Sequence, residues 1–252
     1  MPPEEWLDVG ANFQSRLAEK HSLLASHHDK IFMARPEALE ASREFLAMLR
    51  DYLRQYHPGV PILEDSGLHP LDFAARMVIE DFCLLLPSND DYYLAAASLH
   101  APSGWQLGHK IGKTLSQLHA EVPHYPEQLS AGVQNFFRSY KAGKSNGRFN
   151  WGIFTDPALF QPQRLPPARP VTAENAGQNL WLRAERQMFH RLPQSNAMIF
   201  TIHTDVRRLD EVIETPQDAE DLALAISRMS PELKAYKAID LIEAPLAGWL
   251  RR

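Results

Sequence analysis

The stretch LWLRAERQMFHRLPQSNAMIFTIHT, residues 180–204, decides the fold class of this chain. Its second half, AMIFTIHT, has the β-branched and aromatic composition of a strand. Its first half is compatible with a helix by composition, but apolar residues recur on one side when it is read with a period of two. Because PQSN between the halves is a turn signal, we predict two paired antiparallel strands. The apolar positions of the first strand are Leu180, Leu182, Ala184, Met188 and Leu192.

A second hairpin is predicted nearer the N-terminus. The segments RMVIEDFCLLLP (76–87) and DYYLAAASLHAP (91–102) are short apolar runs on either side of PSNDD. Two strand-like runs around such a dense group of turn-forming residues indicate a β-hairpin. Cys83 falls inside the first of these strands, where we expect a small buried core residue.

Helices are predicted on both sides of these strands. Residues 36–58 carry an apolar stripe near the helical period, and Pro58 ends it. Two more helices are expected near 107–120 and 126–142, and helix-start signals open two further helices near the C-terminus. The segments behind these last two are TPQDAEDLALAISRMS (215–230) and PELKAYKAI (231–239).

Two segments are predicted to be mainly irregular. Residues 143–157 are expected to form a loop that leads into a short strand, and the proline-rich residues 160–170 a surface loop. The order of elements predicts an α+β fold, with a mainly antiparallel sheet flanked by helices. We expect a helical N-terminal extension over 1–60 and the main domain over 61–252.

The overall composition limits the class of function. The chain has 252 residues, a net charge of −5 and one cysteine. This charge balance gives no reason to expect binding to nucleic acid or to a membrane surface. A single cysteine is typical of a reducing compartment, and the N-terminal MPPEEWLDVG lacks the features of a signal peptide. We therefore expect a cytoplasmic protein. The sequence contains no GxGxxG, GxxxxGK[ST], HExxH or GxSxG motif.

One histidine stands out on the predicted helix 107–119. On such a helix Leu107, Ile111, Leu115 and Leu118 share a face, and His119 lies at its edge. Gly108 and Gly112 would lie on the side of His119 and leave a flat strip beside the imidazole. One histidine can hold haem iron from one axial side. The alternative is structural, because a cationic imidazole is also favoured at a helix C-terminus.

A second group of polar residues lies in the segment 143–157 and in the first half of the 180–204 stretch. Residues 148–151 bring Arg148 beside Asn150 and Trp151. On a strand, Arg183, Glu185 and Gln187 share one face and Arg186 points to the other. These residues form either surface ion pairs of little energetic value or a set of guanidinium groups that could hold haem propionates or another carboxylate.

Taken in order, several of these segments resemble one family. They are EDFCLL, PSGW, KIGKTLSQLHAEVPHY, RFNW, LWLRAERQMFHRLPQSNAMIFTIHT and AYKAI. This set resembles the haem-dependent oxidative N-demethylase α-subunit-like family over about residues 60–240. The resemblance implies a PAS-type α+β domain that binds haem b and oxidises a small secondary alkylamine such as dimethylamine, releasing formaldehyde. It also implies O2 as oxidant and electrons from a separate flavin/ferredoxin-type reductase, because the chain carries no recognisable flavin or iron–sulfur segment.

The resemblance also implies roles for individual residues. His119 is our prediction for the axial iron ligand, and His190, His203 and Cys83 are its competitors. Glu185 and Arg186 are predicted to act in catalysis, with Glu185 holding a protonated amine. The residues predicted to surround the haem are His119, Gly108, Gly112, Trp105, Lys110, Arg148, Asn150, Trp151, Arg183 and Gln187.

Two other classes of function remain open at this point. The first is a non-catalytic haem-binding module that senses or carries, which would bind haem but oxidise no amine. The second is a haem-free structural or partner-binding protein, which would be colourless.

Overall fold

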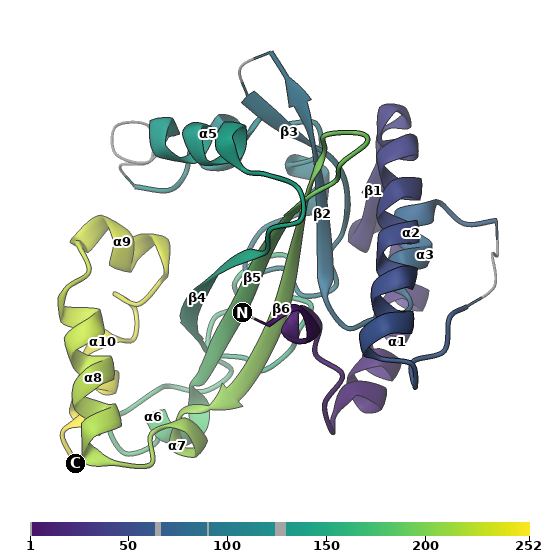
Figure 1. The fold of residues 1–252 in the computed structure, drawn as a ribbon. Helices are drawn as coiled ribbons and strands as arrows, with labels where there is room; N and C mark the ends of the chain where they lie inside the picture. Colours follow the sequence, from purple (N-terminus) through teal and green to yellow (C-terminus); the bar gives the residue numbers. More distant parts are fainter. Residues whose placement is uncertain (1, 64–66, 90, 124–129) are drawn as a thin grey trace.

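A computed structural model describes residues 2–63, 67–89, 91–123 and 130–252. Within them, one sheet of six antiparallel strands has the order β1-β3-β2-β6-β5-β4 (Figure 1). The α+β class, the antiparallel sheet and the helical N-terminal region are confirmed. The strands are β1 (Phe32–Ala34), β2 (Asp81–Ser88), β3 (Asp91–Ser98), β4 (Asn146–Phe154), β5 (Trp181–Arg191) and β6 (Met198–Arg208).

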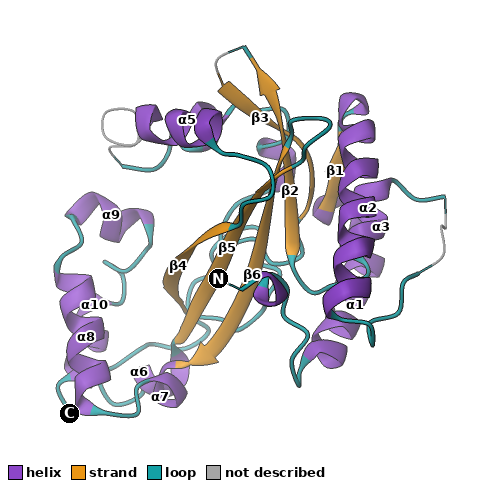
Figure 2. Cartoon of the chain, in the orientation of Figure 1, coloured by secondary structure: helices purple, strands orange, loops and turns teal. Residues whose placement is uncertain are grey.

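Helices lie around this sheet (Figure 2). The α-helices are α1 (Phe13–Ile31), α2 (Leu39–Tyr56), α3 (Pro70–Ala75), α4 (Leu115–Leu118), α5 (Ser130–Ser139), α6 (Ala176–Asn179), α7 (Leu209–Val212), α8 (Pro216–Ser227), α9 (Pro231–Tyr236) and α10 (Glu243–Leu250). Short 3-10 helices are η1 (Pro3–Glu5), η2 (Pro36–Ala38) and η3 (Leu107–His109).

The predicted hairpin of residues 180–204 is present as β5 and β6. Its register runs without interruption from the pair Trp181 and Arg208 to the pair Arg191 and Met198. Asn196 in the connecting turn has a φ of 59°, a left-handed conformation that asparagine tolerates better than most residues. The first half of the stretch is therefore a strand, as its period of two predicted.

The upstream hairpin is also present, with shorter strands than expected. β2 and β3 pair from Phe82 and Ser98 to Ser88 and Asp91, with an irregularity between Leu84 and Leu85. β2 also pairs with β6, which joins the two hairpins into one sheet. Cys83 is buried on β2, as predicted. Asp90, in the predicted turn segment PSNDD, lies outside the described residues.

The two faces of the sheet carry separate apolar clusters. Paired residues share a face, so Cys83, Phe200 and Phe189 point to one side, which we call the α5 face. Side chains of η3, α4 and α5 pack on it. The other side, the α2 face, carries Phe82 and Leu84, which pack with α2 and α3. A third cluster joins the last helices to the far ends of β4 and β5.

The helix predictions near the chain ends are confirmed. α2 lies within residues 36–58, and its buried side carries Phe45, Leu49 and Leu53. α8 and α9 begin after Thr215 and Ser230, whose side chains accept hydrogen bonds from the first helical turn. The division into units 1–60 and 61–252 remains a prediction.

The prediction of a single helix over 107–120 is wrong. The chain forms η3, then a turn, and only then the four-residue α4. Gly112 has a φ of +80°, and its N–H donates to the carbonyl of Leu94 on β3. A left-handed glycine ends helical propagation, and the Thr114 side chain caps a new start. The flat glycine strip beside His119 therefore does not exist. For the helix predicted over 126–142, residues 126–129 lie outside the described residues, and α5 covers its central part.

The packing of α6 against α10 gives a direct test of the fold. A Cβ at Gly177 would lie 2.6 Å from the Trp249 ring. We expect Gly177→Ala to lower the free energy of unfolding by about 1–3 kcal/mol, because an overpacked site must shift. The control is Gly132→Ala on α5, where an added Cβ meets nothing within 4 Å. This control should raise stability by up to about 1 kcal/mol, since alanine is the better helix former. Urea denaturation measures both, and equal effects would contradict this packing.

Candidate functional site

The middle of β5 points polar side chains into the α5 face. Arg183, Glu185 and Gln187 are 1%, 7% and 5% exposed. The alternation of the strand predicted that these three share a face, and the structure shows that this face is buried. Buried charges are costly unless they have close polar partners, so the contacts of these residues matter.

Glu185 is held by three donors from different parts of the chain. The Ser103 hydroxyl donates to its Oε1 at 2.5 Å. The Asn150 amide, on β4, donates to Oε2 at 3.2 Å, and the Gln187 amide donates to the same oxygen at 2.7 Å. Gln187 in turn accepts a hydrogen bond from Arg148 Nε at 2.7 Å. The structure thus joins four predicted residues and Ser103 in one network.

Arg183 has a different role from the one predicted. Its terminal N–H groups donate to backbone carbonyls on two loops, among them Ala101 at 2.5 Å and Leu159 at 3.2 Å. Burial lowers its pKa. Because these donors already have partners, Arg183 ties the two loops together and is poorly placed to hold a propionate.

Two further cations lie near this network. Lys237, just after α9, donates from Nζ to Asn150 Oδ1 at 3.2 Å and to the Trp151 carbonyl at 2.6 Å. Burial lowers the pKa of Lys237, and the negative charge of Glu185 opposes this. Arg164, from the proline-rich loop, stacks 4.3 Å from the Phe154 ring centroid. Burial lowers its pKa as well, again opposed by Glu185 among other groups.

Sequence reasoning did not select Ser103, Arg164 or Lys237. Lys237 lies in the segment AYKAI that the family resemblance includes, so that segment was a usable signal. Ser103 lies in PSGW, another segment of the resemblance, so it had the same signal. Arg164 lies in an irregular segment without a motif, and only the folded chain brings it near the network.

His119 lies on the same side of the sheet, at the end of α4. Its Nδ1 lies 2.8 Å from the Leu115 carbonyl oxygen, which can only accept, so Nδ1 carries the proton. Burial lowers the pKa of His119, and the positive charges of Arg148 and Lys110 lower it further. The neutral ring therefore keeps its proton on Nδ1, which is the tautomer of a histidine that binds metal through Nε2.

Lys110 lies near the end of α4, and Trp105 packs on the same side of the sheet. Lys110 lies 3.3 Å from Glu121 Oε2 and donates to the Leu118 carbonyl at 3.4 Å. Trp105 belongs to a group of partly buried apolar side chains on the α5 face. The group also contains Ile111, Leu118, Val133, Phe136, Phe189 and Phe200.

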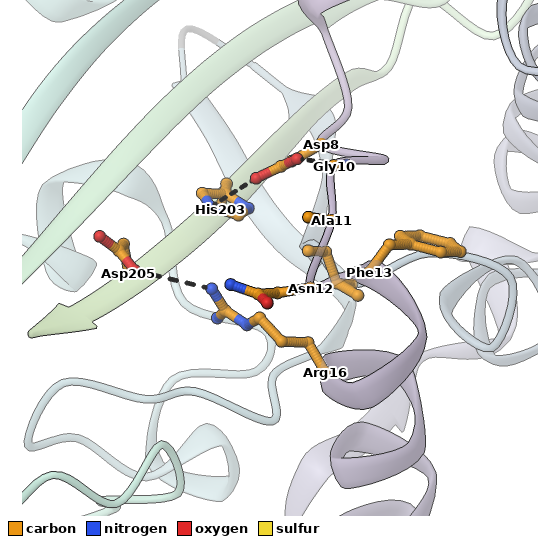
Figure 3. Close-up of a pocket in the computed structure, with 9 residues that line it drawn as sticks. Asp8, Gly10, Ala11, Asn12, Phe13, Arg16, His203 and Asp205 are labelled. Carbon is orange, nitrogen blue, oxygen red and sulfur yellow. Dashed lines mark hydrogen bonds and ion pairs between the residues drawn. The ribbon is translucent and has the colours of Figure 1, made fainter.

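The three competing iron ligands have less suitable surroundings. His190 packs on Trp6, with ring centroids 4.4 Å apart, on the α2 face. His203 also lies on that face and points toward Asp8 (Figure 3). Cys83 is on the α5 face, but burial raises the pKa of its thiol strongly, whereas iron binds the thiolate.

Four other predicted residues are not brought into the network. Trp151 pairs with Ala184, on the opposite side from Glu185, and its side chain packs with the cluster of the last helices. Arg186 lies on the α2 face, where it donates to the Glu5 carbonyl, so the two predicted catalytic residues are on opposite faces. Gly108 lies against Met33, and Gly112 against Arg35. The glycines therefore shape turns beside β1 and β3 and do not line the side of His119.

The sequence matches one protein family over most of its length. The model of the family described as haem-dependent oxidative N-demethylase, alpha subunit-like, matches residues 1–67 and 59–247. The chain belongs to this family. Membership in the N-demethylase-like family points to a haem-dependent, oxidative role of this general type. Among the described helices, none is long and apolar enough to cross a membrane.

The side-chain chemistry of the α5 face is compatible with a haem. His119 offers a neutral imidazole whose Nδ1–H is already held by the Leu115 carbonyl. Arg148, Arg164 and Lys237 outnumber the nearby Glu185, so the region favours anionic groups such as propionates. The half-buried aromatic side chains beside them can cover a flat macrocycle. Among the described residues no three His, Cys, Asp or Glu side chains converge on a point, and one axial histidine does not require this.

The burial of His190 predicts that the stability of the fold decreases at acidic pH. Burial lowers its pKa to about 4, from an ordinary value of 6.5. Between these values the unfolded chain binds a proton that the folded chain does not, so stability falls as the pH falls from 6.5 to 4. The loss from this one group is about 3 kcal/mol.

Replacing His190 with Phe keeps a ring on Trp6 and removes the titration. We expect His190→Phe to show a shallower loss of stability over this pH range, measured by urea denaturation at several pH values. A pH dependence identical to that of the wild type would show that His190 is accessible to protons in the folded chain.

Proposed function

We propose that this chain binds haem b on its α5 face and oxidises the N-methyl group of a small secondary alkylamine such as dimethylamine. The products are methylamine, formaldehyde and water. The reaction consumes O2, two electrons and two protons, and the electrons come from a separate flavin/ferredoxin-type reductase. The observation that carries this proposal is the combination, on one face, of a neutral His119, several cations and the anchored carboxylate of Glu185, in a chain of the N-demethylase-like family.

The contacts described above support the proposed haem ligands. His119 binds iron through Nε2, and Arg148, Lys110 and Lys237 hold the propionates. When bound, haem supplies the activation of O2 and the oxidation of the N-methyl group. Trp105 and the neighbouring apolar side chains exclude water from the site.

Glu185 is proposed to bind the amine. A small alkylamine is protonated at neutral pH, since its pKa is close to that of lysine. A carboxylate has about four acceptor positions, and three are used by Ser103, Asn150 and Gln187. The fourth position can accept the N–H of the amine. Thr204, the partner of Glu185 in the strand register, has a buried hydroxyl without a hydrogen-bond partner among the described residues. This hydroxyl offers a second polar contact beside Glu185.

The PAS-type arrangement and the cytoplasmic location are part of the same proposal. In support of the first, η3, α4 and α5 are inserted between the β2–β3 hairpin and the three strands that complete the sheet. In support of the second, the single cysteine, Cys83, is free and buried.

The iron ligand is tested by His119→Ala. We expect protein expressed with added haem to show a strong Soret band that is lost or shifted in this variant. The control is His109→Ala, an exposed histidine on η3, which should leave the band unchanged. A Soret band that His119→Ala does not alter would move the ligand to another residue. A colourless wild type would contradict haem binding altogether.

The amine site is tested by Glu185→Gln. We expect dimethylammonium to change the haem spectrum of the wild type, and its Kd to rise at least about tenfold in the variant, because a charged acceptor is lost. The control is Glu211→Gln, a half-exposed carboxylate on α7, which should not change the Kd. A haem spectrum that no amine alters would instead favour a non-catalytic sensor or carrier.

A further inference from the structure

Arg183 and Glu185 are connected by a second route besides the strand that carries both. They lie two residues apart on β5 and project from the same face. The Arg183 Nη2 group donates to the carbonyls of Ala101 at 2.5 Å and Pro102 at 3.4 Å. Ser103 comes next in the chain, and its hydroxyl donates to Glu185 Oε1 at 2.5 Å. Arg183 thus holds the segment whose next residue contacts Glu185.

The other half of the Arg183 guanidinium holds a second loop. Its Nη1 group donates to the Leu159 carbonyl at 3.2 Å. Two residues further on, Gln161 forms a parallel bridge with Ser103, and its carbonyl accepts the Gly104 N–H at 2.9 Å. One guanidinium therefore fixes both the backbone that precedes Ser103 and the loop that supports the backbone at Ser103.

These contacts use the shape of the guanidinium more than its charge. Arg183 is 1% exposed, and every hydrogen bond that it makes with the described residues goes to a backbone carbonyl. Its guanidinium carbon also lies 5.4 Å from the centroid of the Phe154 ring. A planar fork can serve acceptors on two sides at fixed angles, whereas a lysine ammonium cannot. Lysine at this position would keep the charge and lose the geometry.

The Ser103 hydroxyl limits how the Glu185 carboxylate can turn. The two donors to Oε2 come from Asn150 and Gln187, and they hold only that oxygen. Oε1 has one donor among the described residues, the Ser103 hydroxyl. Without this donor, Oε1 could change its direction and bind water instead. The direction of the remaining acceptor position on Glu185 therefore depends on where the loop puts Ser103.

We propose that Arg183 is a positioning residue for the amine site. Its guanidinium fork places the Ser103 hydroxyl on Glu185, and so sets the direction in which Glu185 accepts the N–H of the amine. This role rests on the amine site under "Proposed function", whereas the contact between Ser103 and Glu185 exists without any ligand. Arg183 touches neither the amine nor the haem, and it acts on Glu185 only through Ser103.

The first test reads the position of the carboxylate without an amine. The side-chain NH2 groups of Asn150 and Gln187 both donate to Glu185 Oε2, so their NMR signals report on it. The spectra are recorded on the full chain, with any bound haem reduced and kept as its diamagnetic carbon monoxide form. We expect Arg183→Lys to shift both signals in the same direction as Ser103→Ala. Arg183→Gln, which removes the buried charge, should do the same and serves if the lysine variant does not fold.

The matched control is Arg191→Lys. Arg191 lies on the same strand, is 9% exposed and also donates to backbone carbonyls, among them Tyr140 at 2.6 Å. It pairs with Met198 at the turn end of β5, away from Ser103. We expect Arg191→Lys to leave the two side-chain signals at their wild-type positions. Equal shifts from the Arg183 and Arg191 variants, or no shift from the Arg183 variants, would overturn the proposal.

The second test measures whether Arg183 acts through Ser103. The Kd of dimethylammonium, read from the haem spectrum, should rise at least about threefold in Arg183→Lys and in Ser103→Ala, because a less ordered site binds more weakly. The double variant should bind no more weakly than Ser103→Ala alone, since both changes remove the same contact. Effects that multiply in the double variant would overturn the route through Ser103.

The outcomes distinguish this proposal from the proposed function. A wild-type haem spectrum that dimethylammonium leaves unchanged would contradict the amine site, and with it the effect of Arg183 on amine binding. The signals of Asn150 and Gln187 would still decide whether Arg183 places Ser103 on Glu185. Amine binding to the wild type, together with unchanged side-chain signals in the Arg183 variants, would support the proposed function and overturn the positioning role.

Discussion

The register between β5 and β6 determines which side chains each face of the sheet receives. Pairing Glu185 with Thr204 puts a carboxylate and a hydroxyl on the α5 face, and pairing Arg186 with His203 puts two nitrogen-rich side chains on the other. A slip of one residue would exchange these sets completely. Apolar contacts at the turn end of the hairpin hold the register, since Met188, Met198 and Ile199 are at most 1% exposed. The polar middle of the hairpin thus depends on the packing beyond it.

The sheet separates two electrostatic environments. On the α5 face, Arg148, Arg164 and Lys237 lie around one carboxylate, so the region suits anionic groups. On the α2 face, carboxylates and guanidiniums are matched: Asp205 lies near Arg16 and Arg207, and Glu80 lies near Arg186. Both regions include residues of the β5–β6 hairpin, and these residues project from opposite sides of it. One pair of strands therefore presents a different set of polar side chains to each side of the sheet.

Much of the fold could be predicted from the sequence, because local patterns there agree with the tertiary structure. The period of two in residues 180–192 identified β5 and correctly put Arg186 opposite Glu185. The prediction failed at 107–120, where the apolar spacing is helical but Gly112 adopts a left-handed turn that donates to Leu94. The spacing of apolar residues indicates which side chains are buried. The backbone conformation at Gly112 depends in addition on its long-range hydrogen bond with β3. The site was predicted only in part, because Ser103, Arg164 and Lys237 reach Glu185 or its neighbours through folding of distant loops.

The contact between Lys237 and Asn150 has a consequence for the order of assembly. Asn150 and Glu185 lie on adjacent strands and can meet as soon as β4 and β5 have left the ribosome. Lys237 follows Glu185 by about fifty residues. A segment of this length takes several seconds to synthesise at ordinary translation rates. A nascent chain therefore carries the carboxylate network for some time without its last cation. The positive charge of Lys237 reaches this surface only when the chain after α9 docks. The order of synthesis therefore sets when the network gains this cation.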